Sequence, residues 1–178
     1  MHLVFLGFVR DLCRLINRSF FKEAALNEHD GGMSAKDWVQ LGIDMSQIRS
    51  PKDWGRSPRN ISLNLKSFKA EELSNFLIHW LLPLTFNRVT PSTYKALQSF
   101  VLAISLATSP ELEYSEIDEI GKHLALFLKW FLNTYYQDNN RRLPVCKYTV
   151  HALMHLVRDV RNWGPACNFW QFPEVGPT

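Results

Sequence analysis

Apolar residues recur at helical spacing along most of the 178-residue chain, and helix-ending residues separate the runs. A period of about 3.6 residues is typical of helices that bury one face. The strongest start signal is Thr90 followed by Pro91, because proline is tolerated in the first turn of a helix. No stretch of useful length alternates between apolar and polar residues, which is the pattern of a half-buried strand. The sequence therefore predicts an all-α fold.

About six such helices are expected around one core. Residues 3–16 form the first, and the last extends from about 147 to 162, before Gly164 and Pro165. The helices between them are expected to begin at four signals: Ser34 with Asp37, Ser67, Thr90 with Pro91, and Ser115 with Asp118. Because 46% of the residues are hydrophobic, the chain can fill a core. Residues 1–178 are therefore predicted to form a single helical domain.

Residues 3–9 are apolar, but Arg10 and Asp11 follow at once and the apolar spacing continues beyond them. A signal peptide has a longer apolar stretch, and a membrane span needs roughly 20 apolar residues. This segment is therefore predicted to be a core helix, and no membrane partner is expected. The cysteines are odd in number and widely spaced, which predicts free thiols in a reducing compartment: Cys13, Cys146 and Cys167. The first two are interpreted as small buried hydrophobes.

Residues 49–68 form the least regular stretch and are predicted to be an extended basic loop. Residues 49–69 contain six basic residues and one acidic residue, a local net charge of +5. Basic side chains around an exposed Trp54 can follow a phosphate backbone while the indole stacks on a base. The alternative is a solvated connection whose tryptophan fills a gap in the core. On the first interpretation, nucleic-acid binding is assigned to four residues: Arg56, Arg59, Lys66 and Lys69.

His151 and His155 are spaced one helical turn apart, so both project from one face, as in zinc-binding helices. Ala152 occupies the position where a metalloprotease helix has its glutamate, and no third ligand has a supporting spacing. Packed or hydrogen-bonded histidines are therefore the preferred interpretation. The acids at helix starts, Glu71 and Glu72 among them, are interpreted as offsetting the helix dipole. No catalytic residue, metal ligand, cofactor or small-molecule substrate is predicted.

A series of short motifs occurs in order along nearly the whole chain. In chain order they are MHLVFL at residues 1–6, GRSPRNI at 55–61, FKAEEL at 68–73, LLP at 81–83, LPVC at 143–146, HAL at 151–153, WGP at 163–165 and WQFP at 170–173. No single motif is specific, but the ordered set resembles the CACTA-type (En/Spm superfamily) transposases in their fungal form.

These transposases are DNA-cleaving and strand-joining enzymes with an RNase H-like core, three metal-binding acids and a helical insertion. The family has an aspartate shortly before its Met-His step, and it continues Trp-Gln-Phe-Pro into an acid-arginine pair. The sequence starts at the Met-His step, so the aspartate before it is not present. Glu174 is followed by valine and not by arginine, so the acid-arginine pair is not present either. The resemblance therefore implies the helical C-terminal region of a transposase, cut at both ends and without the β-sheet. It implies a nuclear, transposase-derived domain that is not catalytic on its own. The local charge of +5 in residues 49–69 adds the expectation of weak nucleic-acid binding.

The alternative is a protein-interaction module. Without the sheet, the first helix and an irregular aromatic tail at about 163–178 are expected to expose apolar surface that once packed against it. Large exposed apolar patches on soluble domains usually mark a binding surface. Such a surface would bind a protein partner or a second copy of the chain.

Overall fold

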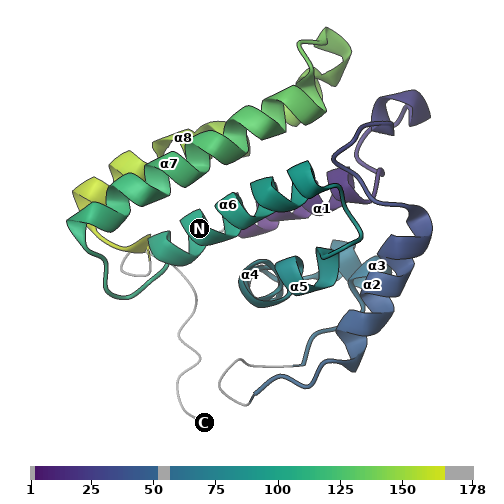
Figure 1. Ribbon diagram of the computed structural model, residues 1–178, viewed down its shortest axis with the longest axis horizontal. Helices are drawn as coiled ribbons and strands as arrows, with labels where there is room; N and C mark the ends of the chain where they lie inside the picture. The colour runs from purple at the N-terminus through teal and green to yellow at the C-terminus, as the bar shows by residue number, and fades with distance from the viewer. Residues whose placement is uncertain (1–2, 52–56, 167–178) are drawn as a thin grey trace.

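Helices account for all the regular structure in residues 3–51 and 57–166, which the computed structural model describes (Figure 1). The all-α prediction is confirmed. In chain order the elements are η1 (Leu3–Val9), α1 (Arg10–Ile16), η2 (Ala24–Asn27), α2 (Ala35–Gln47), α3 (Ile61–Asn64), η4 (Leu65–Ser67), α4 (Ala70–Asn75), η5 (Phe76–Trp80), α5 (Leu81–Thr85), α6 (Pro91–Ala107), α7 (Tyr114–Phe131), η6 (Leu132–Tyr136), η7 (Asn140–Val145) and α8 (Tyr148–Trp163).

The longest helices lie side by side, with α6 against α7 and α7 against α8. The shorter helices α2, α3, α4 and α5 gather on the other side of α6 (Figure 1). The first helical segment, η1, contacts both α8 and α4, and therefore joins the two groups. One continuous hydrophobic cluster contains residues from η1 through α8, as expected of a single domain.

Aromatic rings form the centre of this cluster. Phe8 of η1 packs edge-on against Phe100 of α6 and Phe127 of α7, with centroid distances of 5.2 and 5.8 Å. Phe100 and Phe127 stack at 4.4 Å, and Phe131 lies 5.4 Å from Phe8. All four side chains are buried. The first helix is thus a core helix, as predicted, because its apolar face lies between helices that come later in the chain.

Two of the four start signals are confirmed. The Ser34 hydroxyl accepts a hydrogen bond from the Asp37 N–H at 3.1 Å, so α2 begins directly after it. The Thr90 hydroxyl accepts from the Thr93 N–H at 3.2 Å, and Pro91 is the first residue of α6. In each case the side-chain oxygen satisfies a backbone donor that the helix itself leaves unpaired.

The helix starts predicted at Ser67 and at Ser115 were wrong. Helix α4 begins after Lys69, whose N–H donates to the Glu72 carboxylate at 2.9 Å, while the Ser67 hydroxyl donates back to the Asn64 carbonyl. In the same way α7 begins after Glu113, whose N–H donates to the Glu116 carboxylate at 2.7 Å. A glutamate three residues into a helix can satisfy the preceding N–H, and here it sets the first residue of both helices.

The second half of the segment at 49–68 is helical, unlike the extended loop predicted there. Asn60 accepts from the N–H groups of Ser62 and Leu63 and so starts α3. Helix α3 lies against α2 at Gly42, where an added Cβ would lie 2.2 Å from the Asn60 Oδ1 atom. Glycine at this position therefore permits the close approach of the two helices. Ile61, the first residue of α3, is fully buried.

No helix in the described residues is both long enough and apolar enough to cross a lipid bilayer.

Candidate functional site

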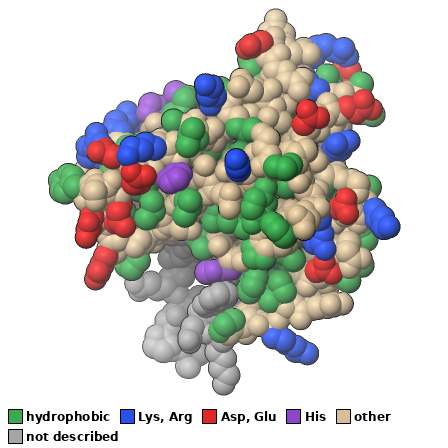
Figure 2. Space-filling view, viewed as in Figure 1, with side chains coloured by type: hydrophobic (Ala, Val, Ile, Leu, Met, Phe, Trp, Pro, Cys, Tyr) green, Lys and Arg blue, Asp and Glu red, His purple; other side chains and the backbone are tan. Residues whose placement is uncertain are grey.

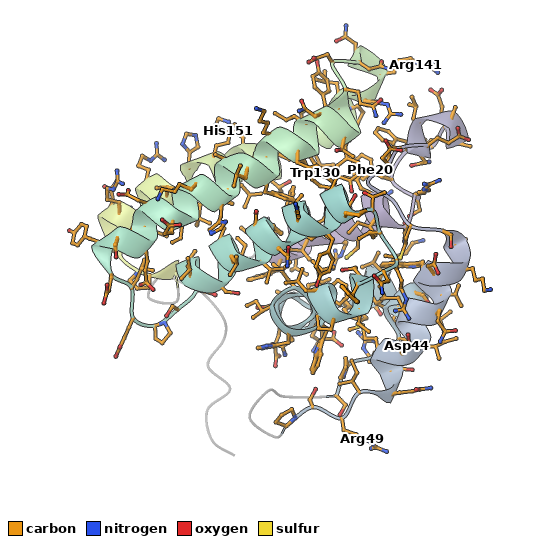
Figure 3. The ribbon with its side chains drawn as sticks, viewed as in Figure 1. Phe20, Asp44, Arg49, Trp130, Arg141 and His151 are labelled. Carbon is orange, nitrogen blue, oxygen red and sulfur yellow. The ribbon has the colours of Figure 1, made fainter. Side chains whose placement is uncertain are left out.

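The sequence-predicted nucleic-acid site divides into residues of different character. Arg56 and Trp54 lie outside the described residues. Arg59 is held in place by other groups of the fold, whereas Lys66 and Lys69 are exposed. Arg49, another basic residue of this segment, extends from the end of α2 into solvent (Figure 3).

Arg59 forms a two-pronged ion pair with Glu72 of α4. Its Nε donates to Oε1 at 2.6 Å and its Nη2 donates to Oε2 at 2.8 Å. Nη2 also donates to the Ser67 carbonyl at 3.2 Å, and the guanidinium lies 5.0 Å from the centre of the buried Phe68 ring. Such a fork-to-carboxylate pair fixes geometry as well as charge. The guanidinium that was assigned to DNA therefore already has an anionic partner.

The ion pair and the helix start are one unit, because Glu72 accepts from both Arg59 and the Lys69 N–H. Burial alone would raise the pKa of the Glu72 carboxyl, but these hydrogen bonds outweigh it and lower that pKa below its usual range. The hydrogen bond to Glu72 likewise raises the pKa of Arg59. We conclude that Arg59 joins residues 59–69 to α4.

Lys66 and Lys69 form no ion pair with any carboxylate of the described residues, and neither does Arg49. The side chains of all three are exposed. The charge of Lys69 acts on the nearby Glu72 carboxylate without forming an ion pair, and an exposed cation outside an ion pair can still attract a polyanion. These three side chains are therefore better placed than Arg59 to contact phosphate.

The acidic candidates have structural roles, as the sequence reading proposed for most of them. Glu72 and Glu116 accept from backbone N–H groups at helix starts, and Glu119 pairs with Lys122 at 2.5 Å. Asp118 of α7 pairs with Arg161 of α8 at 3.0 Å. No group of three or more histidine, cysteine or acidic residues in residues 3–51 and 57–166 is placed to hold a metal ion. Glu174 lies outside the described residues.

The two histidines of α8 are hydrogen-bonded to each other. Packed or hydrogen-bonded histidines were the preferred interpretation of the sequence. Their Nε2 atoms are 2.9 Å apart on the outer face of the helix. Of the two cysteines interpreted as buried hydrophobes, Cys13 is buried, and burial raises the pKa of its thiol to about 12. Cys146 is exposed, so that interpretation was wrong for this residue. Both thiols are free, and Cys167 lies outside the described residues.

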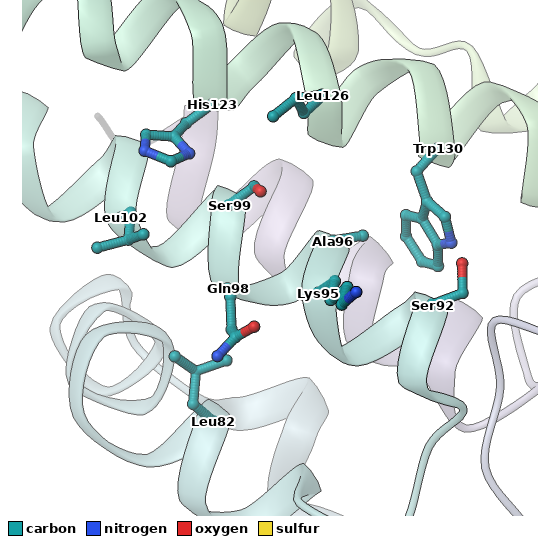
Figure 4. Close-up of a pocket in the computed structure, with 10 residues that line it drawn as sticks. All are labelled: Leu82, Ser92, Lys95, Ala96, Gln98, Ser99, Leu102, His123, Leu126 and Trp130. Atoms are coloured by element: carbon teal, nitrogen blue, oxygen red, sulfur yellow. The ribbon is translucent and has the colours of Figure 1, made fainter.

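An apolar groove between α5, α6 and α7 escaped the sequence analysis. It has a volume of about 670 Å³, and Figure 4 shows Leu126 and Trp130 of α7 facing α6 across it. Leu102 of α6 is 48% exposed and Leu126 is 60% exposed. Hydrophobic side chains also gather on this face of the molecule over α5 and α6 (Figure 2). The sequence contained one sign of this groove, because both leucines lie outside the apolar stripes with which α6 and α7 face the core.

The exposed apolar surface of the structure is not the one that was expected to contact a protein partner. The apolar side chains of the first helix, such as Phe5 and Leu12, are buried against the other helices, so this helix does not offer the exposed face that was expected. The aromatic tail from residue 167 onward lies outside the described residues. An exposed apolar surface does exist, but it belongs to α5, α6 and α7.

A buried polar cluster near η2 was also missed. The His29 ring is 7% exposed, neither of its nitrogens has a hydrogen-bond partner, and it packs edge-on against Tyr135 at 4.8 Å. Burial first, and then the nearby Arg18 and Arg142, lower the His29 pKa to about 4. Arg142 is buried as well and donates to the carbonyls of Tyr135 and Glu28. The cluster joins residues more than 100 positions apart, so no local pattern reveals it.

Comparisons with protein-family models, with curated proteins and with solved structures find no match to this chain.

Proposed function

We propose that this chain is a transposase-derived helical domain that binds nucleic acid weakly through the phosphate backbone, by itself without catalysis. The observation that supports binding is the exposure of Lys66 and Lys69, which have no carboxylate partner in the described residues. The ordered series of short motifs that resembles CACTA-type transposases supports the proposed origin from a transposase, and with it a nuclear location. Glu72, Glu116 and Asp118 take part in helix starts and ion pairs, which agrees with the proposal that the domain is not catalytic on its own.

Lys66 and Lys69 are the proposed phosphate contacts, together with Arg49. Counterions are released when a lysine neutralises a phosphate, so each contact adds to the salt dependence of binding. Arg59 has a different role in this proposal. It holds η4 and the start of α4 together through Glu72 and the Ser67 carbonyl.

Replacing both lysines in a Lys66→Gln/Lys69→Gln variant should weaken DNA binding and flatten its salt dependence. The slope of log affinity against log salt concentration should fall by about one per lost contact, or about two in total. Fluorescence anisotropy with a labelled duplex, repeated from low to moderate salt, measures this slope. The helix start should survive, because Lys69 contributes its backbone N–H to Glu72.

A matched variant, Lys36→Gln/Lys129→Gln, removes the same charge from exposed positions on α2 and α7. It should keep most of the slope. An equal loss in both variants would mean that net charge alone drives binding. Arg59→Gln should lower the melting temperature while leaving the slope nearly unchanged. The proposal fails if the wild-type protein shows no salt-sensitive retention of DNA at low ionic strength.

The groove between α5, α6 and α7 supports a second candidate function, protein contact. Half of its lining residues are apolar, namely Leu82, Ala96, Leu102, Leu126 and Trp130, and the other half are polar, namely Ser92, Lys95, Gln98, Ser99 and His123. An apolar helix face is the kind of surface that such grooves take up. In a pure sample the available occupant is a second copy of the chain.

Wild-type protein should therefore self-associate as its concentration rises, and a Leu102→Gln/Leu126→Gln variant should remain monomeric. Both leucines are about half exposed or more, so the variant should still fold. Sedimentation velocity of the wild type and of the variant over a hundredfold concentration range distinguishes self-association from a monomer. A wild-type protein that stays monomeric at the highest concentration would exclude this occupant.

A further inference from the structure

The outer face of α8 carries an imidazole pair that the proposed nucleic-acid binding does not use. His151 and His155 project from consecutive turns of α8 (Tyr148–Trp163). The angle between their ring planes is 80°, and the ring centroids are 4.5 Å apart. The opposite face of the helix is buried through Leu153, Leu156 and Val160. The helix is thus fixed to the core on one side, and on the other side it carries His151, which is exposed, and His155, which is half-buried.

The distance between the two Nε2 atoms is 2.9 Å. A metal ion bound by two nitrogens at about 2.05 Å each, with a right angle between the bonds, requires a nitrogen separation of about 2.9 Å. A tetrahedral angle at the same bond length requires about 3.3 Å. The observed separation therefore matches two adjacent positions of a square-planar or octahedral ion, which is the geometry of Cu²⁺ and Ni²⁺ with nitrogen ligands.

We propose that His151 and His155 form a two-ligand site for a late divalent transition metal, with Cu²⁺ bound more tightly than Ni²⁺ and both more tightly than Zn²⁺. On binding, the ring whose Nε2 carries the shared proton moves that proton to its Nδ1, so both Nε2 atoms present lone pairs to the ion and each neutral ring carries one proton on Nδ1. Metal affinity order and geometry favour Cu²⁺ in the same direction.

The rest of the coordination sphere comes from solvent or from another molecule. Asp159 lies one further turn along α8, but its Oδ1 accepts from the Arg158 Nη2 at 3.1 Å. No third histidine, cysteine or acid of the described residues is placed to complete the set. The site therefore binds an ion with open positions, and it cross-links two turns of the helix.

Isothermal titration of CuCl₂ and NiCl₂ into untagged protein tests the proposal, in a buffer that does not chelate metals. All proteins carry His2→Ala, so that the histidine beside the chain's first residue does not compete. We expect one ion per chain and an affinity at least tenfold lower in His151→Ala and in His155→Ala. The Cu²⁺ electron paramagnetic resonance spectrum should show two coupled nitrogens in the parent and one in each variant.

Two further variants serve as controls. His123→Ala removes a histidine from α7 and should keep the parent affinity. His155→Ala/Arg158→His keeps two histidines on α8 but separates them by seven residues, which is about 10 Å along the helix, so it should bind no better than His155→Ala alone. The proposal is overturned if the parent does not bind either ion at millimolar concentration, or if the separated pair binds as tightly as the natural one.

Discussion

Replacing Phe127 by alanine should destabilise the fold by about 3–5 kcal/mol, which is the range observed when a buried phenylalanine is truncated. Phe127 is fully buried, and its ring stacks on Phe100 at 4.4 Å and packs edge-on against Phe8 at 5.8 Å. The alanine would leave a cavity at the point where η1, α6 and α7 meet. The fall in melting temperature should be about 6–20 °C, measured by the circular dichroism of the helices during heating.

The neighbouring residue offers a matched control. Leu126→Ala also removes an apolar side chain from α7, but that side chain is 60% exposed in the groove. Its cost should be within about 0.5 kcal/mol, measured in dilute solution where self-association does not contribute. Similar losses in the two variants would contradict the orientation of α7. A small loss in Phe127→Ala alone would mean that the aromatic cluster is not the centre of the core.

This orientation of α7 was predictable, because helical periodicity is a local property of the sequence. Apolar residues three and four positions apart mark the buried face whatever the helix packs against. The starts of α4 and α7 were not predicted, because a serine and a glutamate near the start of a helix can each satisfy backbone donors and indicate different first residues. At Lys69 and Glu113 the glutamate three residues on forms the bond, and the nearby serines do not.

The basic segment was predictable as a concentration of charge, but the role of each residue was not. Arg59 and Glu72 are 13 positions apart, and only the turn through α3 and η4 brings them into a two-pronged ion pair. The same turn leaves Lys66 and Lys69 exposed. The sequence thus indicates where positive charge collects, whereas the fold determines which charges remain available to a polyanion.

The polar cluster around His29 could not be predicted at all. The segment before α2 has no period, and the residues that surround the ring come from both ends of the chain. Tyr135, against which the ring packs, donates its hydroxyl proton to the Gly31 carbonyl at 2.9 Å, and burial raises its pKa. Contacts across more than 100 residues arise only when the helices assemble.

Acidification from about pH 6.5 to about pH 4 should remove about 3 kcal/mol of folding free energy through His29. In the folded chain its pKa is lowered to about 4, from an ordinary value of 6.5. The unfolded chain therefore gains a proton in this interval while the folded chain does not. Each pKa unit is worth about 1.4 kcal/mol, so the stability present above pH 6.5 decreases as the pH falls towards 4.

Urea denaturation of the wild type and of His29→Phe at several pH values measures this contribution. Phenylalanine can keep the packing against Tyr135 and cannot bind a proton, so the variant should lose about 3 kcal/mol less than the wild type over the interval. The carboxylates titrate in both proteins and cancel in the difference.

The sign of the effect at neutral pH tests the physical cause separately. Both ring nitrogens of His29 are buried without a hydrogen-bond partner, and a buried polar atom in that state costs roughly 1–3 kcal/mol. An apolar ring removes this cost but adds volume beside Tyr135, so His29→Phe at pH 7.5 should be at least as stable as the wild type when the ring fits. A large loss at pH 7.5 combined with an unchanged acid slope would mean that His29 is held by polar contacts. A flattened slope at preserved stability would establish a neutral imidazole that resists protonation because it is buried and because Arg18 and Arg142 lie beside it.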